Sequence, residues 1–225
     1  MIRILLKCPL TGVFVLYLTC SCSLGIDSRD CLVGEGAVVS ENRPLSGNFT
    51  AVQHAIPGDL YITQGSPASL TLEGQQNLLP SLTTTIDNGI LNLSFRECLE
   101  SATPFNARLT MPELTEASLL GSGNILFVND VQSEHLQIAI VGQGNLDLRG
   151  EADTLKINLT GQGNALAFNL TSQVCEVNIQ GQGDVSVTAN LSLDVFIDGQ
   201  GNVSYKGMPE ITSMIRGQGT IIDAN

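Results

Sequence analysis

In the second half of the chain, apolar and polar residues alternate along runs that lie between evenly spaced glycine pairs. Before each glycine pair the apolar positions fall at every second residue, as in Leu136, Ile138 and Ile140. A shorter alternation follows each pair, as in Leu146 and Leu148. Because successive side chains of a β-strand point to opposite faces, both runs predict strands with one apolar and one polar face. We therefore expect two strands in each repeat.

The glycine pairs belong to a tetrapeptide, Gly-x-Gly-Asn with small variations, which occurs six times. The copies begin at Gly121, Gly142, Gly161, Gly181, Gly199 and Gly217, so their starts lie 21, 19, 20, 18 and 18 residues apart. Repeats of this period are typical of solenoids. One such coil cannot bury its apolar face alone, but stacked coils with strands about 4.8 Å apart cover one another. The pattern predicts an all-β fold, a single-stranded parallel β-helix.

The fourth residue of each tetrapeptide defines a second repeat, which we call the corner column. It comprises Asn124, Asn145, Asn164, Asp184, Asn202 and Thr220. Glycine suits turns at positive φ, and Asn accepts left-handed geometry more readily than most residues. Stacked Asn or Gln amides also hydrogen-bond along a column, as they do in cross-β ladders. We therefore predict that the corner column is structural and lies at the turns between strands.

The first half of the chain lacks the glycine period but keeps strand-like runs between turn signals. These runs cover residues 49–55, 59–64, 69–73, 82–86 and 90–95, with a hairpin signal at Asn88-Gly89 and one helical turn at 75–79, ended by Pro80. Solenoids need caps, because an open terminal coil exposes unpaired strand groups. Residues 34–119 therefore predict irregular coils or an antiparallel cap, and residues 120–225 the regular coils of the same domain.

Residues 1–22 have the features of an export signal, namely positive charge, an apolar run and small residues. The apolar run at residues 10–19 is too short for a membrane span. The end of the segment resembles a bacterial lipoprotein signal, in which a cysteine after a small residue becomes the lipidated N-terminus. We predict lipidation at Cys22, with Cys20 as the second candidate, and a tether over residues 23–33. An ordinary cleaved signal peptide is the alternative.

The charge of the chain limits its partners. The sequence has 10 Lys and Arg against 22 Asp and Glu, a net charge of −12, and removal of Arg3 and Lys7 with the signal takes it to −14. Such a charge repels nucleic acid, so no nucleic-acid partner is expected. Membrane contact is expected through the lipid anchor alone.

Three cysteines lie beyond the signal segment. Cys175 occupies an inward position of the alternating pattern, where a thiol packs as a small apolar side chain. Cys31 and Cys98 are candidates for a disulfide in an oxidising compartment, but their spacing alone leaves this open. No Cys-x-x-Cys pair occurs, which argues against a zinc site.

Catalytic, cofactor and metal sites are not expected. A polysaccharide-active enzyme on this fold would need clustered acids and aromatic platforms, yet the chain has no Trp and only 4% aromatic residues. His54 and His135 are far apart in sequence and lack a metal-ligand spacing. Calcium would need carboxylates in each coil, whereas only Asp184 places one in the corner column.

The segments 34–36, 41–52, 58–65, 77–80 and 87–91, followed by the Gly-x-Gly-Asn corners, resemble the putative auto-transporter adhesin, head GIN domain family. The resemblance implies a β-helical, secreted or surface-anchored bacterial protein, often a lipoprotein, without catalytic residues. We expect a non-enzymatic envelope protein, at the outer membrane, whose acidic β surface binds an unknown protein or glycan. A structural envelope spacer is the alternative, and a polysaccharide-active enzyme is a more distant one.

The final coil is incomplete in the sequence, since only five residues follow Thr220. An uncovered strand edge with apolar neighbours tends to pair with another copy of itself. Lys206, Pro209 and Arg216 are residues of the kind that prevents such pairing. We therefore expect a monomer, with self-association at this end as the alternative.

Overall fold

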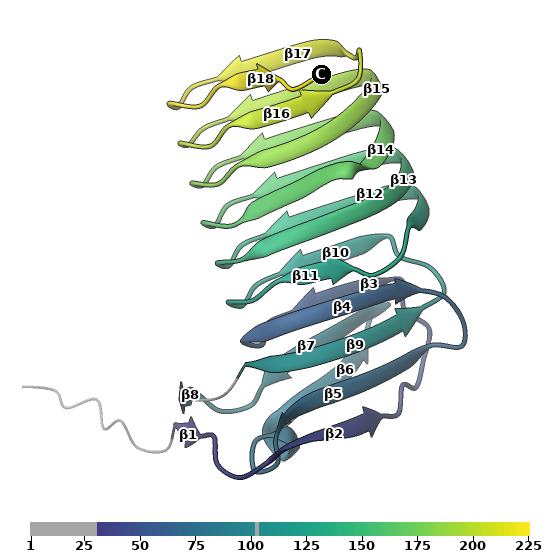
Figure 1. Cartoon of the computed structure of the whole chain (residues 1–225), viewed down its shortest axis with the longest axis vertical. Helices are drawn as coiled ribbons and strands as arrows, with labels where there is room; N and C mark the ends of the chain where they lie inside the picture. The colour runs from purple at the N-terminus through teal and green to yellow at the C-terminus, as the bar shows by residue number, and fades with distance from the viewer. Residues whose placement is uncertain (1–30, 102–103) are drawn as a thin grey trace, which may run out of the picture.

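The computed structural model describes residues 31–101 and 104–225, and this part of the chain is almost entirely β. The strands are β1 (Leu32–Val33), β2 (Val38–Arg43), β3 (Ala51–His54), β4 (Gly58–Gln64), β5 (Ser69–Gln75), β6 (Leu82–Asp87), β7 (Ile90–Phe95), β8 (Leu99–Ser101), β9 (Phe105–Met111), β10 (Glu116–Leu119), β11 (Ile125–Phe127), β12 (Val131–Ile140), β13 (Asn145–Leu159), β14 (Asn164–Ile179), β15 (Val185–Ile197), β16 (Val203–Lys206), β17 (Glu210–Ile215) and β18 (Ile221–Asp223), and a short 3₁₀ helix, η1, covers Leu79–Ser81. The strands stack into a parallel β-solenoid (Figure 1), which confirms the predicted fold class.

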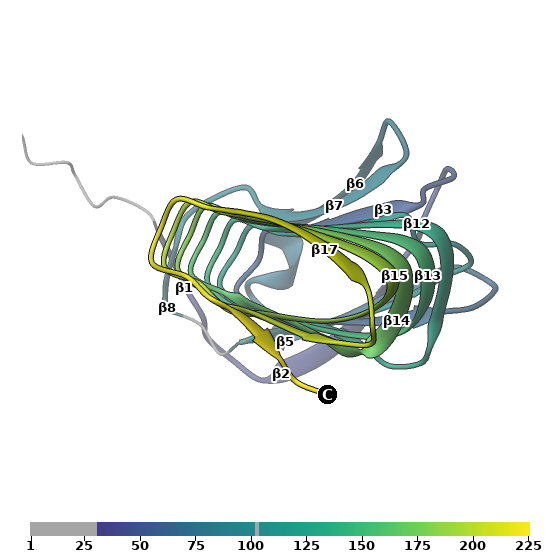
Figure 2. The same cartoon turned by 90° about the horizontal axis from the view of Figure 1, so that it is seen from above.

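Each coil is a flattened loop with a narrow and a wide end (Figure 2). The glycine tetrapeptides form the narrow end, for example between β17 and β18. At the wide end the prediction of two separate strands is wrong for the central coils, because β13, β14 and β15 each continue around it as one bent strand. The alternation breaks there only locally, so the sequence pattern shows two runs where the backbone forms one strand.

The wide end also absorbs the differences in coil length. Neighbouring coils shift register between Asp147 and Arg149, between Ala167 and Thr171, and between Ser172 and Val174. All three shifts lie on the wide side, whereas the residues that approach the glycine pairs stay aligned from β12 to β17, as in the series Ile140, Leu159, Ile179 and Ile197. Bulges insert residues without disturbing the rest of a ladder. The corners therefore stay in phase although the repeat length varies.

Stacking order differs from chain order in the first half of the protein. The coil formed by β3 and β4 lies between β7 and β9 on one side and β10 and β11 on the other, with parallel pairing throughout. The section predicted as irregular coils or an antiparallel cap, residues 34–119, therefore contains both parallel coils and antiparallel strands. Parallel coils already begin with residues 51–64, because the chain leaves the stack after β4 and returns beneath that coil before it continues upward.

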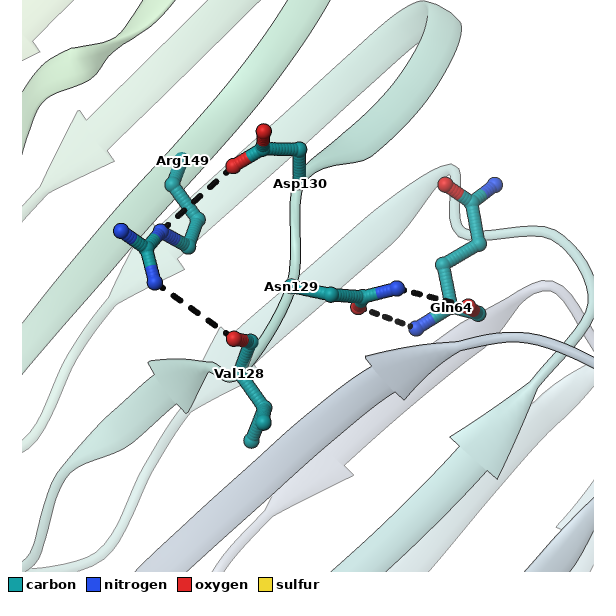
Figure 3. A network of polar contacts seen from close by, with 5 residues as sticks. All are labelled: Gln64, Val128, Asn129, Asp130 and Arg149. Atoms are coloured by element: carbon teal, nitrogen blue, oxygen red, sulfur yellow. Dashed lines mark hydrogen bonds and ion pairs between the residues drawn. The ribbon is translucent and has the colours of Figure 1, made fainter.

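Polar contacts at the wide end hold this displaced coil in place (Figure 3). The side-chain amide of Asn129 forms two hydrogen bonds of 2.9 Å with the backbone of Gln64, because its Oδ1 accepts the Gln64 N–H and its Nδ2 donates to the Gln64 carbonyl oxygen. Arg149, one coil further on, donates to the carbonyl oxygen of Val128 at 3.5 Å and forms an ion pair of 3.6 Å with Asp130. The loop 128–130 thus contacts the coil of β4, 65 residues earlier in the chain, and the next coil, 21 residues later.

An antiparallel section covers the N-terminal end of the stack. β5 pairs antiparallel with β2 and β9, and β6 pairs antiparallel with β7 across the predicted Asn88-Gly89 turn. Both turn residues have positive φ, 50° and 80°, as this type of hairpin requires. The predicted helical turn is displaced, since η1 begins at Leu79 and contains Pro80. β1 pairs with β8, and Cys31 is bonded to Cys98, so residues 31–33 of the expected tether are part of the fold, while its other residues lie outside the described range.

The core runs through the inside of the coils as continuous columns of apolar residues. One column contains Val52, Ala117, Ile138, Ile157, Val177 and Val195, all buried.

In the last coil Ile211 and Ile215 keep this inward register but are 39% and 43% exposed, because no described strand covers them. Pro209 lies in the turn before β17, and Lys206 and Arg216 lie over the aromatic rings of Phe168 and Phe196 in earlier coils.

Candidate functional site

The narrow end of the coils is built around the glycine pairs, which bring consecutive coils into very close contact. A Cβ atom on Gly142 would overlap the carbonyl oxygen of Gly121, and one on Gly144 would overlap that of Gly123. The same holds at every later corner. None of the corner glycines of the six tetrapeptides has a positive φ. The expectation of a left-handed turn is therefore wrong, and these positions need glycine because any side chain would meet backbone.

The corner column forms a hydrogen-bonded ladder along the stack. Asn124 and Asn202 each donate a side-chain amide to the residue below, at 2.8 and 3.0 Å, and Asn164 donates to Asn145 Oδ1 at 2.8 Å. Backbone N–H groups add to the ladder, since Asp184 N donates to Asn164 Oδ1 at 2.8 Å. Thr220 closes the upper end through its N–H and hydroxyl, both donated to Asn202 Oδ1. Every carboxamide in the column is used within the protein.

Asp59 is a further member of the ladder that the repeat analysis missed. Its Oδ1 accepts the backbone N–H of Asn124 at 3.1 Å and the side-chain amide at 2.8 Å. A carboxylate only accepts hydrogen bonds, so it is suited to the lower end of a column whose amides all donate downward. The sequence does contain a signal, because Gly58-Asp59 precedes the alternating Leu60 and Ile62 as Gly144-Asn145 precedes Leu146 and Leu148.

A second column of side chains lies next to the ladder, and we call it the glutamine column. It comprises Gln143, Gln162, Gln182, Gln200 and Gln218, which are all exposed. Their backbone N–H groups bond to the coil below, as from Gln162 to the carbonyl of Gly142 at 3.2 Å. Their carboxamides make no hydrogen bond to any described part of the chain. The two columns therefore differ in kind, one satisfied internally and one free.

The glutamine column forms one wall of a groove of about 800 Å³ along the narrow end, which we call the corner groove. The glycines from Gly121 to Gly199 form its floor. The opposite wall consists of the residues that precede the glycine pairs, Leu120, Val141, Thr160 and Gln180. This wall changes from apolar at the lower coils to polar at the upper coils.

The contrast between the two columns has a measurable consequence for stability. Asn164→Ala removes one donor and one acceptor of the ladder and is expected to cost about 1 kcal/mol, the usual net value of a hydrogen bond. Gln162→Ala, two residues away in the same corner, is expected to change the free energy of unfolding by less than about 0.5 kcal/mol. Urea unfolding measures both. Equal losses in the two variants would contradict the division into a structural and a free column.

The two histidines differ in burial. His54 is fully buried in a core column between Leu93 and Leu119, where its Nε2–H donates to the carbonyl of Gly58 at 2.8 Å. Burial lowers the pKa of His54, although the Gly58 carbonyl and Asp59 act in the opposite direction, so the ring is neutral at physiological pH. His135 is exposed on β12. Neither residue belongs to the corner groove.

The described cysteines have no catalytic environment. Burial raises the pKa of Cys175 to about 12, which keeps its thiol protonated among the core residues Val177 and Leu193. The proposed lipidation sites Cys22 and Cys20 lie outside the described residues. Across 31–101 and 104–225, no group of three His, Cys, Asp or Glu side chains is placed to hold a metal ion. The same ranges contain no helix with the length and apolarity of a membrane span.

Fold and corners together define a class of protein, a parallel β-solenoid whose turns are stacked on glycine pairs and joined by an asparagine ladder. The family model for the putative auto-transporter adhesin, head GIN domain, matches residues 48–209, and the chain belongs to that family. The matched range includes the displaced coil of β3 and β4 and the corners up to Gly199. No match was found among curated proteins.

Solved structures of low sequence identity share the fold. A putative adhesin from Bacteroides fragilis is 23% identical, with a TM-score of 0.69 over 84% of this chain and 98% of that chain. A putative adhesin from Parabacteroides merdae is 19% identical, with a TM-score of 0.57 over 87% and 100%. A putative lipid binding protein from Parabacteroides distasonis is 21% identical, with a TM-score of 0.51 over 87% and 100%. At these identities the likeness concerns the fold.

Proposed function

We propose that the protein is a non-enzymatic, exported envelope lipoprotein whose solenoid acts as an adhesin-like binding domain. The observation that carries the proposal is the free glutamine column beside a fully satisfied asparagine ladder. A purely structural spacer has no need of a groove lined by unpaired carboxamides. Family membership supports the adhesin-like role, and the cavity residues offer binding groups rather than a nucleophile with its base.

Export and anchoring are supported by the N-terminal end of the molecule. The disulfide between Cys31 and Cys98 suits an oxidising compartment outside the cytosol. It also ties the N-terminal strand β1 to the base of the stack, below all the parallel coils (Figure 1). Cys31 is nine residues beyond Cys22, and an extended chain of that length reaches roughly 30 Å. Lipidation at Cys22 would then hold the base of the solenoid near the membrane. The corner groove, which lies on later coils, would be further from the membrane than the base.

Lipid labelling tests the anchor. Full-length protein expressed in a bacterial host with labelled palmitate is expected to carry the label, and Cys22→Ser is expected to lose both the label and its partition into detergent. Cys20→Ser should keep both. Loss of label in Cys20→Ser but not in Cys22→Ser would move the lipidation site to Cys20. An unlabelled wild-type protein would contradict the lipoprotein assignment altogether.

A further inference from the structure

We propose that the corner groove binds an uncharged, extended polysaccharide whose sugar rings lie along the stack axis, one to each coil. The proposal deepens the binding role proposed above and depends on it. It concerns the narrow end of the solenoid (Figure 2), where the turns of successive coils are aligned in a straight row. The ligand would contact the glutamine column on one side and the opposite wall, formed by Leu120, Val141, Thr160 and Gln180, on the other.

The glutamine carboxamides supply the recognition chemistry. Each offers two N–H donors and one carbonyl acceptor, the complement of a sugar hydroxyl, which both donates and accepts. Gln143, Gln162, Gln182 and Gln200 line the groove in consecutive coils, and none uses these groups within the described chain. At the lower coils, the opposite wall adds Leu120 and Val141, which are 37% and 53% exposed. The C–H faces of a pyranose ring can pack against these two side chains.

Charge favours a neutral ligand. No ionisable side chain lines the groove, although the chain as a whole carries a net charge of −12. An acidic polymer would be repelled by the whole molecule, and it would find no cation in the groove. A cationic ligand would find no carboxylate there. Recognition at this site therefore relies on uncharged hydrogen-bonding groups.

The spacing of the rungs favours a sugar chain over a peptide. Neighbouring coils are about 4.8 Å apart, so the five coils of the groove span roughly 20 Å. The rise per ring of an extended pyranose chain is close to this distance between neighbouring coils. An extended peptide rises about 3.3 Å per residue and presents the same side only every second residue, so it loses register with the glutamines at once.

The backbone at the corners also excludes strand addition by a peptide. Peptides that extend a sheet need free N–H and C=O groups along an edge. Here the N–H groups of Gln143, Gln162 and Gln182 already bond to glycine carbonyls one coil below, at 3.1 to 3.2 Å. The groove therefore presents side chains as its binding groups.

Three aromatic rings on the outer faces of the described solenoid are covered by cations of the same chain. Tyr61 lies under Arg108, with the guanidinium carbon 4.7 Å from the ring centroid. Phe168 lies under Lys206 at 4.6 Å, and Phe196 lies under Arg216 at 5.5 Å. These three outward rings are already covered by cations of this chain. The corner groove, in contrast, offers unpaired carboxamides in consecutive coils.

Calorimetric titration tests the proposal with full-length protein in detergent micelles. The probes are cellohexaose and chitohexaose, which are neutral, with an oligogalacturonate and an unstructured polar peptide as the other arms. We expect saturable binding of at least one neutral hexasaccharide and an affinity that rises with chain length from two to five sugars. Binding only to the acidic oligosaccharide or only to the peptide would overturn the ligand class.

The double variant Gln162→Ala/Gln182→Ala assigns the site. It is expected to weaken binding by about 30-fold, the usual effect of losing two neutral hydrogen bonds. Gln173→Ala, an exposed glutamine on β14 outside the groove, should bind within about twofold of wild type. Unchanged circular dichroism and thermal midpoint establish that the double variant is folded. Equal affinity of the double variant and wild type, or no saturable binding of either hexasaccharide, would overturn the proposal, while the labelling experiment above tests the anchor separately.

Discussion

Gly144→Ala is expected to destabilise the protein by about 3 kcal/mol or more, although it adds a single methyl group at the surface. The new Cβ would overlap the carbonyl oxygen of Gly123 in the coil below, and backbone cannot move aside as a flexible side chain can. The corner would have to separate from its neighbour. That movement would stretch the bond from Asn145 N to Asn124 Oδ1, now 3.0 Å, and the one from Gln143 N to Gly121 O, now 3.2 Å.

Gly65→Ala is the matched control for this variant. Gly65 also lies at the end of a strand of the solenoid, but a Cβ there would meet only Thr110 Cγ2, at an ordinary contact distance of 3.5 Å, and no left-handed φ is required. We expect a change within about 0.5 kcal/mol in the free energy of unfolding, measured in urea. Similar midpoints for the two variants would mean that the coils are not in close contact at the corners.

At the corners, the sequence predicts the positions of the glycine and asparagine columns correctly, but the physical reason for the glycines differs from the expected one. Glycine and Asn recur at constant phase, so the position of the column is readable from the chain. The cause is not readable, because backbone approach between coils and left-handed turns both require glycine. Only the three-dimensional stack shows that Gly144 needs its missing Cβ, whereas Gly58, at φ 128°, also adopts a conformation that side chains rarely allow.

Local alternation predicts strands well and stacking order poorly. Residues 59–64, 69–73 and 90–95 were expected as strands, and β4, β5 and β7 contain them. Nothing in their pattern indicates that β4 pairs with β9 on one side and β11 on the other, since any apolar strand face fits the same core. The specific contacts at the wide end, such as Gln64 with Asn129, decide between such alternatives, and they join residues 65 positions apart.

The candidate site illustrates the same limit. Periodicity places Gln143, Gln162 and Gln182 in a column and Asn124, Asn145 and Asn164 in another, and it treats their amides alike. The structure separates them, because the Asn side chains hydrogen-bond to the neighbouring coil, whereas the Gln carboxamides make no hydrogen bond within the described chain. The difference that supports a binding role is therefore one of hydrogen-bond satisfaction, which composition does not reveal.

Ile157→Asp is expected to cost several kcal/mol at pH 7, whereas Asn158→Asp next to it should cost less than about 1 kcal/mol. Ile157 is fully buried between Ile138 and Val177, so a carboxylate there would have neither water nor a partner. The neighbouring Asn158 points outward and is partly exposed. The two substitutions introduce the same group one residue apart on opposite faces of β13.

The pH dependence of the Ile157→Asp variant separates burial of a charge from loss of packing. Burial raises the pKa of an introduced carboxyl group, so the folded state would bind a proton more tightly than the unfolded state. The loss relative to wild type, measured by urea unfolding at each pH, should therefore be largest near pH 7 and should decrease as the pH falls toward 5. A loss that stays constant across this range would assign the effect to the smaller apolar volume alone. Equal losses for Ile157→Asp and Asn158→Asp would contradict the register of β13 and, with it, the inward columns on which the stack depends.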